Sequence, residues 1–316
     1  MTGMTSSVQV LGDTLVRLGA ERKEVVVCVA DCLKTMSVQD FAAKYPDRLF
    51  NLGIAEQNMV MAAAGLSTTG KTPFAISYGV FLSMRTLEQV RTFVSYPHLN
   101  VKFVAGLGGY SAGINGPTHA ATEDVSVMRA IPGMTVIVPA DAIAIEKAIK
   151  AAVDYPGPVY IRLGMTVPNV HGPDYPFEIG KAVPLRKGGK DATIVACGIM
   201  VGKALEAADQ LAKEGLAVQL LEIHTLKPID RAEIVRVARE TGAIVTAEEN
   251  NVQGGLGGAV AEVLAEEIPT PMVRVGIQDR YADTGSHDQL LERFGLTTES
   301  IVVAVRRVVA RKLHGS

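Results

Sequence analysis

Short apolar runs that alternate with segments of helical periodicity constrain the fold more than any other feature of the sequence. Apolar side chains recur at helical spacing over residues 8–20 and again over 142–153. The apolar runs cover residues 25–30, 74–77, 101–105, 135–139 and 159–163. A run of this length is typical of a parallel strand that is buried on both faces. Strands that alternate with helices predict a mostly parallel sheet with helices on both faces.

The alternation breaks once, and the break predicts two domains. Prolines and glycines interrupt residues 167–184, after which strands and helices resume near residue 192. A chain of 316 residues is also too long for one ordinary hydrophobic core, at roughly 150 residues per domain. We therefore predict two doubly wound α/β domains, residues 1–168 and a smaller domain at 191–316, joined by a linker at 169–190.

Charge and cysteine content argue against several classes of protein. The net charge of −2 gives no reason to expect nucleic acid or an anionic membrane as a partner. The three cysteines lack zinc-site spacing, and their odd number argues against a disulfide framework, which favours a reducing compartment. The apolar runs stay well short of the roughly 18 residues that a membrane span needs, and no secretory signal is visible. We expect a cytoplasmic protein.

Two carboxylates stand at positions where such sheets bind ligands. Glu56 lies between Gly53 and an apolar helical run at 59–66, and a carboxylate is rarely buried without a partner or a task. Capping of that helix explains Glu56 equally well, because the helix dipole stabilises a carboxylate in the first turn. Asp31 follows the run at 25–30, and open α/β sheets place ligands at such strand ends. Capping of the following turn is the simpler role for Asp31.

A histidine and an aromatic pair lie in the same predicted domain as these carboxylates. His119 follows a glycine-rich segment at 106–116, and histidine is the usual acid or base near neutral pH. A hydrogen-bonded structural role is the alternative. Tyr78 and Phe81 are three residues apart, so they lie on one side of a helical turn. They either pack in the core or form a stacking surface for a flat heteroaromatic ring.

A second glycine-rich element, residues 254–258, precedes a predicted helix at 259–267 in the second domain. Backbone N–H groups at such a helix start are able to hold an anion. The GxGxxG spacing of a dinucleotide site is absent from this element. Close packing of the helix is therefore the simpler explanation for these glycines.

These segments together resemble the C-terminal half of transketolase, as found in two-chain transketolases of bacteria and archaea. The similarity covers nearly the whole chain, and it depends on the order and spacing of motifs that are each weak alone. The motifs are Val29-Ala30-Asp31, residues 50–58 with their Gly-Ile-Ala-Glu-Gln core, residues 78–81, Gly116-Pro117-Thr118-His119, residues 131–141 and residues 157–162. The resemblance implies a pyrimidine-binding domain followed by a smaller α/β transketolase C-terminal domain.

The resemblance implies thiamine diphosphate as the cofactor, with Glu56 and His119 as catalytic residues. Glu56 matches the glutamate that hydrogen-bonds N1′ of the aminopyrimidine, which activates the cofactor. Phe81 matches the aromatic residue that stacks on the pyrimidine, with Tyr78 beside it. His119 matches a histidine near the reacting hydroxyl groups of the sugar. The remaining cofactor-binding residues are expected to be Asp31, Cys32 and Ile54, although an aliphatic residue is usual where Cys32 stands.

The family motif for the diphosphate and its metal is missing. That motif begins Gly-Asp-Gly and ends near Asn-Asn, whereas here Gly12-Asp13-Thr14 lacks the second glycine and Asn250-Asn251 lies in the other domain. We therefore expect no metal ligands in this chain and Mg²⁺ or Ca²⁺ held mainly by a partner. That partner is expected to be an N-terminal transketolase subunit carrying the Gly-Asp-Gly motif, and two copies of each chain to form an α2β2 assembly.

The implied reaction moves a two-carbon ketol unit from a ketose to an aldose, each a sugar or sugar phosphate. Substrate contacts are expected from Asn115, His119 and Arg162. Leu107 stands where sugar-phosphate transketolases commonly carry a histidine, and Ile114-Asn115 replaces an acidic pair. A site that loses such hydrogen-bonding groups changes its choice of substrate. A branched, deoxy or sulfo sugar is therefore expected in place of the standard pentose phosphates.

Three other functions fit the same resemblance. A 1-deoxyxylulose-5-phosphate synthase shares the architecture, but it takes pyruvate and is normally one long chain. The beta subunit of a 2-oxoacid dehydrogenase also shares the architecture and needs a lipoyl partner. A non-catalytic regulatory chain would keep the fold and lose the cofactor site. Release of CO₂ from pyruvate separates the first two from a transketolase, and calorimetry of thiamine diphosphate binding tests the third.

Overall fold

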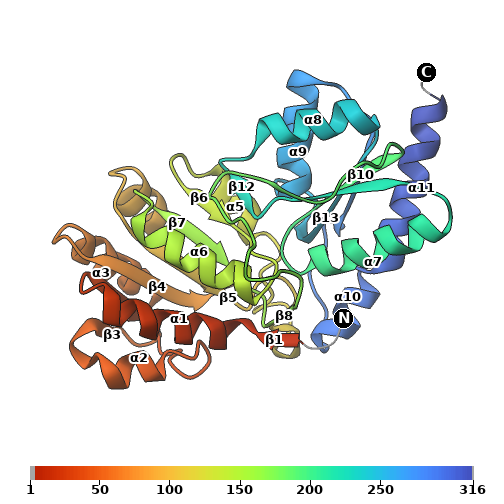
Figure 1. The fold of residues 1–316 in the computed structure, drawn as a ribbon. Coiled ribbons are helices and arrows are strands. Elements are labelled where there is room, and N and C mark those ends of the chain that lie inside the picture. The colour runs from red at the N-terminus through yellow and green to blue at the C-terminus, as the bar shows by residue number, and fades with distance from the viewer. Residues whose placement is uncertain (1–3, 315–316) are drawn as a thin grey trace.

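The computed structural model describes residues 4–314 and consists of two α/β halves, each built on a central sheet (Figure 1). In this part of the chain the first sheet has seven strands in the order β12-β6-β7-β5-β4-β2-β3. Neighbours among β2 to β7 are parallel, whereas β12 is antiparallel to β6. The strands are β2 (Val25–Val29), β3 (Leu49–Asn51), β4 (Thr72–Tyr78), β5 (Lys102–Gly106), β6 (Thr135–Ile137), β7 (Val159–Arg162) and β12 (Thr225–Lys227). The outermost residues of the predicted domains, 1–3 and 315–316, lie outside the described part.

The second sheet has five strands in the order β14-β13-β10-β11-β9 within the same described residues. All neighbours are parallel except the edge strand β9, which is antiparallel to β11. The strands are β9 (Val183–Arg186), β10 (Ala192–Ala196), β11 (Val218–Glu222), β13 (Ile244–Asn251) and β14 (Met272–Ile277). The prediction of two mostly parallel α/β domains is therefore confirmed.

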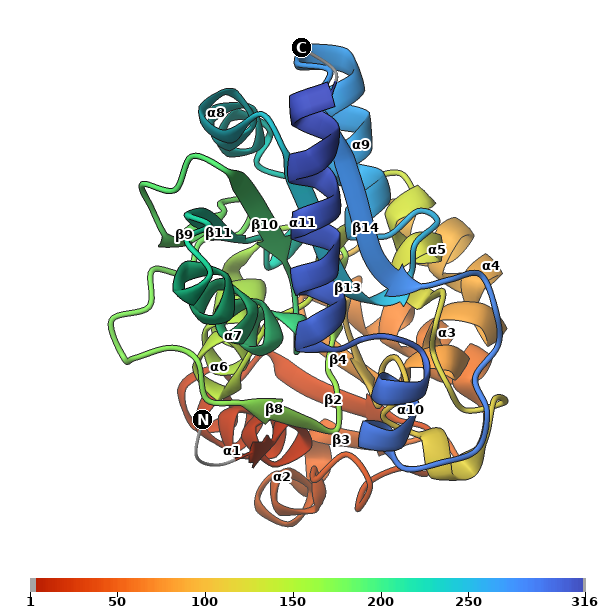
Figure 2. The same ribbon diagram turned by 90° about the vertical axis from the view of Figure 1, so that its right-hand side faces the viewer.

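Helices cover both faces of each sheet, which explains why the strands are apolar on both sides. Along β2, Val27 packs in one hydrophobic layer and Cys28 in the other. One layer contains α1, α6, α7 and α11, and the other contains α3, α5, α8 and α9, so both layers extend through both halves. In Figure 2, α11 lies across the second sheet. The helices are α1 (Ser7–Glu21), α2 (Gln39–Lys44), α3 (Glu56–Ser67), α4 (Leu87–Gln89), α5 (Asp124–Ala130), α6 (Ala142–Asp154), α7 (Met200–Lys213), α8 (Arg231–Thr241), α9 (Leu256–Glu267), α10 (His287–Arg293) and α11 (Thr298–His314).

The segment between the halves contains more regular structure than a linker. Part of the predicted linker forms β9 of the second sheet. Just before it, β8 (Thr166–Pro168) pairs antiparallel with β1 (Met4–Ser6). Asp141 fixes the start of the segment: one carboxylate oxygen accepts from Ala144 N at 2.8 Å to cap α6, and the other accepts from His171 N at 2.7 Å. Because β12 crosses into the first sheet, the two halves are interlocked.

The parallel strands of the first sheet end together, and this edge gathers the predicted site. Val29 pairs with Ile76 and Asn51, and Tyr78 pairs with Gly106, so β2, β3, β4 and β5 finish side by side. Ligands of open α/β sheets bind beyond such carboxyl ends. Within residues 4–314, no helix combines the length and apolar character that crossing a membrane requires.

Candidate functional site

Glu56 opens helix α3 and is buried, with 3% of its surface exposed. Ala55, which precedes it, makes no side-chain cap. The Glu56 carboxylate accepts a hydrogen bond from Nη1 of Arg85 at 2.7 Å, and the Arg85 side chain is 45% exposed. The partner of the carboxylate is therefore a side chain that remains half in solvent. A buried carboxylate of this kind is suited to exchange its partner for a ligand.

Three aromatic rings gather beside this ion pair. The Phe81 ring centroid lies 5.1 Å from that of His119 and 5.7 Å from that of Tyr78, and Tyr78 lies 5.8 Å from His119. The guanidinium of Arg85 lies over the Phe81 ring, 4.3 Å from its centroid, so it contacts both the ring and Glu56. A π-helical turn after β4 carries Phe81 and Arg85. The structure thus brings four of the predicted residues together and adds Arg85, which sequence reasoning missed.

Asp31, Cys32 and Ile54 lie at the ends of the neighbouring strands β2 and β3. Asn51 ties these ends together, because its Oδ1 accepts from the backbone N–H of Asp31 at 3.0 Å. Burial raises the pKa of the Cys32 thiol to about 11, and the negative charges of Glu56 and Asp31 add to that rise. Cys32 is therefore a neutral thiol at pH 7. Ile54 is 78% exposed and Asp31 is also exposed, so both lie at the open rim.

Asn115 and His119 lie on the segment that connects β5 to α5, which we call the 107–121 loop. Gly109 and Ala121 exchange backbone hydrogen bonds of 2.9 and 3.0 Å, and these bonds close the neck of the loop. Asn115 is exposed and His119 is half-buried. Both side chains are thus presented beyond a closed neck, and His119 is the one that contacts the aromatic rings.

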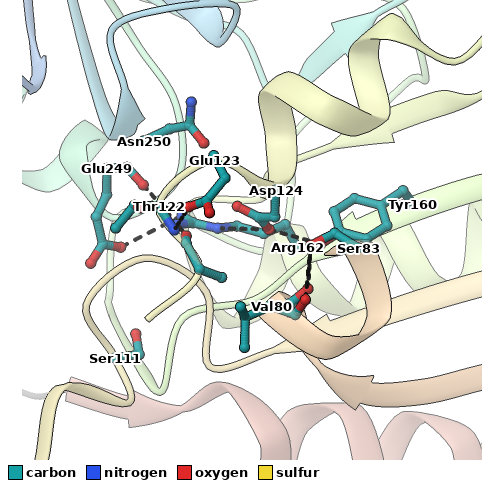
Figure 3. A network of polar contacts seen from close by, with 12 residues as sticks. Val80, Ser83, Ser111, Thr122, Glu123, Asp124, Tyr160, Arg162, Glu249 and Asn250 are labelled. Carbon is teal, nitrogen blue, oxygen red and sulfur yellow. Dashed lines mark hydrogen bonds and ion pairs between the residues drawn. The ribbon is translucent and has the colours of Figure 1, made fainter. Parts of the chain in front are cut away.

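Arg162 lies in a buried polar network with Asp124, Tyr160 and Glu249 (Figure 3). Its side chain is 4% exposed, its Nη2 donates to the Glu249 carbonyl at 2.7 Å, and its Nη1 lies 3.5 Å from the Glu249 carboxylate. Its Nε lies 3.6 Å from Asp124, which also accepts a 2.7 Å hydrogen bond from the Tyr160 hydroxyl. The prediction that Arg162 contacts the substrate is therefore corrected, because two buried carboxylates of the chain already neutralise its charge.

The glycine-rich element of the second half binds a carboxyl group that the chain itself supplies. The backbone N–H groups of Leu256 and Gly257, at the start of α9, both donate to the Glu248 carboxylate at 2.7 Å. Burial raises the pKa of Glu248 to about 7. A Cβ on Gly257 would lie 2.8 Å from Arg274, so the helix also packs closely. The start of α9 thus binds the carboxyl group of Glu248 and also packs closely on Arg274.

The partial diphosphate motif does not form a phosphate-binding loop. Gly12-Asp13-Thr14 lies inside helix α1, where a Cβ on Gly12 would overlap the backbone oxygen of Ser37. Asn250-Asn251 ends β13 in the second sheet. Among residues 4–314, no group of three or more His, Cys, Asp and Glu side chains is placed to hold a metal ion.

Comparison with known proteins identifies two regions of the chain that match domain families. Residues 4–166 match the pyrimidine binding domain of transketolase, and residues 180–301 match the transketolase C-terminal domain. The 6-deoxy-6-sulfo-D-fructose transketolase subunit SqwH of Clostridium sp. (strain MSTE9) is 44% identical over 301 residues, which cover 95% of this chain and 93% of that protein.

Two further proteins are similar over almost the full length. An apulose-4-phosphate transketolase subunit of Phocaeicola vulgatus is 38% identical over 291 residues, covering 92% of this chain and 93% of that protein. A solved structure described as a split gene transketolase, inactive beta4 tetramer, is 48% identical and superimposes with a TM-score of 0.89. That match covers 98% of this chain and 100% of the other.

Proposed function

The chain belongs to the transketolase family, as the C-terminal subunit of a split transketolase, and we propose that it transfers a two-carbon ketol unit from a ketose to an aldose together with an N-terminal subunit. The observation that carries this proposal is the buried carboxylate of Glu56 beside the Phe81 ring. Both lie at the carboxyl ends of parallel strands, where this class of sheet binds ligands. The family depends on thiamine diphosphate, so these residues must suit its aminopyrimidine ring.

The side chains present do suit that ring. An aminopyrimidine is flat and aromatic, which fits the faces of Phe81 and Tyr78, and its basic nitrogen N1′ fits the carboxyl group of Glu56. Glu56 is 3% exposed, and a hydrogen bond in such dry surroundings is stronger than in water. When bound, the cofactor supplies a carbon nucleophile that breaks the bond beside a ketose carbonyl.

The residues of this chain have separate roles in binding the cofactor and the sugar. Glu56 would donate a proton to N1′ and take it back, and Arg85, 2.7 Å from the carboxylate, is its partner within this chain. Phe81 and Tyr78 fix the orientation of the pyrimidine. His119, 5.1 Å from Phe81, is placed to orient the hydroxyl groups of the sugar. The exposed rim around them consists of Asp31, Ile54 and, on the 107–121 loop, Asn115, whereas Cys32 is buried beneath it.

The chain alone is expected to bind thiamine diphosphate too weakly to detect. Among its described residues, Glu56 and Phe81 are expected to contact the pyrimidine. The diphosphate and Mg²⁺ are expected to be bound by the N-terminal subunit with the Gly-Asp-Gly motif. The description of a related split gene transketolase as an inactive beta4 tetramer supports this division. Isothermal titration calorimetry with Mg²⁺ should show binding to the mixed chains in an α2β2 assembly and none to this chain alone. Tight binding by this chain alone would contradict the division, and no binding by the mixture would favour a regulatory chain.

The substrate is expected to be a sugar other than the standard pentose phosphates. Leu107 is apolar and buried where a hydrogen-bonding group is common in the family, and two relatives are named for 6-deoxy-6-sulfo-D-fructose and apulose 4-phosphate. The kcat/KM of the reconstituted pair should be roughly tenfold or more higher on such a sugar than on xylulose 5-phosphate with ribose 5-phosphate. Equal or better kcat/KM on the pentose phosphates would overturn this choice. Release of CO₂ from pyruvate would instead favour a synthase or dehydrogenase.

A further inference from the structure

The 107–121 loop, which presents Asn115 and His119, is held from outside by the C-terminal half of the chain. The backbone bonds between Gly109 and Ala121 close its neck, and the part just beyond the neck, residues 110–113, is buried. That part is contacted by β13 and by residues 284–294, a segment that includes α10. Two separate elements of the second half therefore hold the loop.

Glu249 of β13 makes the first contact. Its Oε1 accepts a hydrogen bond from the backbone N–H of Tyr110 at 2.9 Å and lies 2.7 Å from Nε2 of His287. Its Oε2 lies 3.5 Å from Nη1 of Arg162, and its side chain is 1% exposed (Figure 3). The carboxylate is thus held between a histidine, an arginine and the loop backbone. Any change in its position moves Tyr110, because a buried carboxylate keeps its hydrogen bonds.

Residues around α10 make the second contact. The backbone N–H of Gly285 donates to the carbonyl of Gly113 at 3.1 Å. A Cβ on Gly113 would overlap the side chain of Leu290, so the loop and α10 lie as close as their backbones allow. The Tyr110 ring packs 4.8 Å from the Phe294 ring, centroid to centroid. These contacts fix the backbone of the loop on its approach to the substrate residues.

Glu249 and His287 each favour the charged form of the other. Burial alone would lower the pKa of His287, but the charge of Glu249 and the hydrogen bond to it outweigh burial and raise that pKa above its ordinary value. Burial alone would raise the pKa of Glu249, but His287 and Arg162 lower it below its ordinary value. A hydrogen bond between two such charged groups is shorter and stronger than a neutral one.

We propose that Glu249 and His287 are positioning residues, through which the C-terminal half sets the place of the 107–121 loop and so of Asn115 and His119. This inference rests on the proposed function, because it assigns those two residues to the sugar. Neither Glu249 nor His287 contacts the cofactor residues. Their removal therefore affects the binding of sugar more than the binding of thiamine diphosphate.

His287→Leu in the reconstituted enzyme tests the proposal. The KM for the ketose should rise roughly tenfold, from the loss of a charged hydrogen bond, while thiamine diphosphate affinity stays within about twofold of the unmodified enzyme. His287→Gln keeps an amide donor and should recover part of the KM. Arg293→Leu is the matched control, since Arg293 is on the same helix but is 68% exposed and, among the described residues, pairs with Asp283 at the surface. An unchanged KM in His287→Leu, or equal effects of the two leucine variants, would overturn the proposal.

Hydrogen exchange of the backbone amides tests the anchoring role of His287 without requiring catalytic activity. In the complex with the N-terminal subunit, His287→Leu should speed exchange in residues 110–120 and leave exchange in α3 unchanged, whereas Arg293→Leu should change neither. This measurement requires no substrate, so it remains informative even if the unmodified enzyme transfers no ketol unit. Unchanged exchange in residues 110–120 of His287→Leu would overturn the anchoring role.

The pH dependence of the KM for the ketose is an independent test of the role of the His287 charge. The charged groups that face His287 are Glu249 of β13, Arg162 of β7, Asp288 of its own helix, and Lys203 and Glu206 of α7. Because the pKa of His287 is raised, its charge is complete below the ordinary histidine pKa and is lost as the pH rises through the raised value. The ketose KM of the unmodified enzyme should therefore rise across that alkaline step, and the step should be absent in His287→Gln. An identical step in both proteins would contradict the role of this charge.

Discussion

Replacing Glu56 by glutamine is expected to remove most of the ketol transfer of the reconstituted enzyme, by about 10²- to 10⁴-fold, the usual contribution of a positioned acid or base. Glutamine keeps the size of the side chain and one hydrogen-bonding oxygen, but it is unable to exchange a proton with N1′. The burial of Glu56 makes the loss severe, since with 3% of the residue exposed water has little access to replace the missing group. Initial rates with saturating sugar, cofactor and Mg²⁺ measure the effect.

Glu233→Gln is the matched control for this prediction. Glu233 also lies in the first turn of a helix, α8, and also pairs with an arginine, Arg236 at 2.6 Å. Both substitutions remove a first-turn carboxylate and its favourable interaction with the helix dipole, roughly 0.3–1 kcal/mol. Similar small losses of stability are therefore expected from both, with loss of activity and weaker thiamine diphosphate binding only in Glu56→Gln. Near-normal turnover in Glu56→Gln would leave Glu56 as a first-turn carboxylate of α3 and refute its catalytic role.

The parallel core of the fold was predictable because its strands carry a strong local signal. The run at 25–30 became β2 (Val25–Val29), and the helix predicted at 259–267 became α9 (Leu256–Glu267). The short antiparallel strands were not predictable. β9 and β12 span four and three residues, too few to show periodicity, and each is defined by a partner strand that is distant in the sequence. For the same reason the segment between the halves was predicted as a linker although part of it is β9.

The candidate site was predictable to the extent that it depends on strand ends. Glu56, Tyr78, Phe81 and His119 follow neighbouring strands, so parallel topology alone brings them close. Arg85 was missed because its pairing with Glu56 joins two elements whose relative position no local pattern encodes.

Arg162 was misassigned for a related reason. An arginine at the end of β7 resembles an anion contact in the sequence, but its two carboxylate partners come from α5 and β13. Asp124 belongs to the first half, but Glu249 reaches Arg162 through the packing of the second half on the first.

Arg162→Met is accordingly expected to lower the free energy of unfolding by about 3–5 kcal/mol, the usual cost of breaking a buried ion pair from one side. Methionine fills similar space but leaves the buried carboxylates of Asp124 and Glu249 without their shared cation. Glu249 keeps His287, whereas Asp124 keeps the Tyr160 hydroxyl at 2.7 Å. Asp124 therefore carries the larger share of the cost. Urea unfolding of the isolated chain, followed by circular dichroism, measures the loss.

The double variant Asp124→Asn with Arg162→Met distinguishes the loss of charge from the loss of packing. Burial already raises the pKa of Asp124 in the presence of Arg162, so a neutral side chain at this position should restore part of the stability that the single variant loses. Arg231→Met is the surface control, because Arg231 also contacts two carboxylates, Glu266 and Glu267, but in solvent, where such pairs contribute little. Equal unfolding midpoints for Arg162→Met and Arg231→Met would show that the buried network between the halves is not what stabilises them. A double variant no more stable than Arg162→Met would place the cost in lost packing and not in the uncompensated charge.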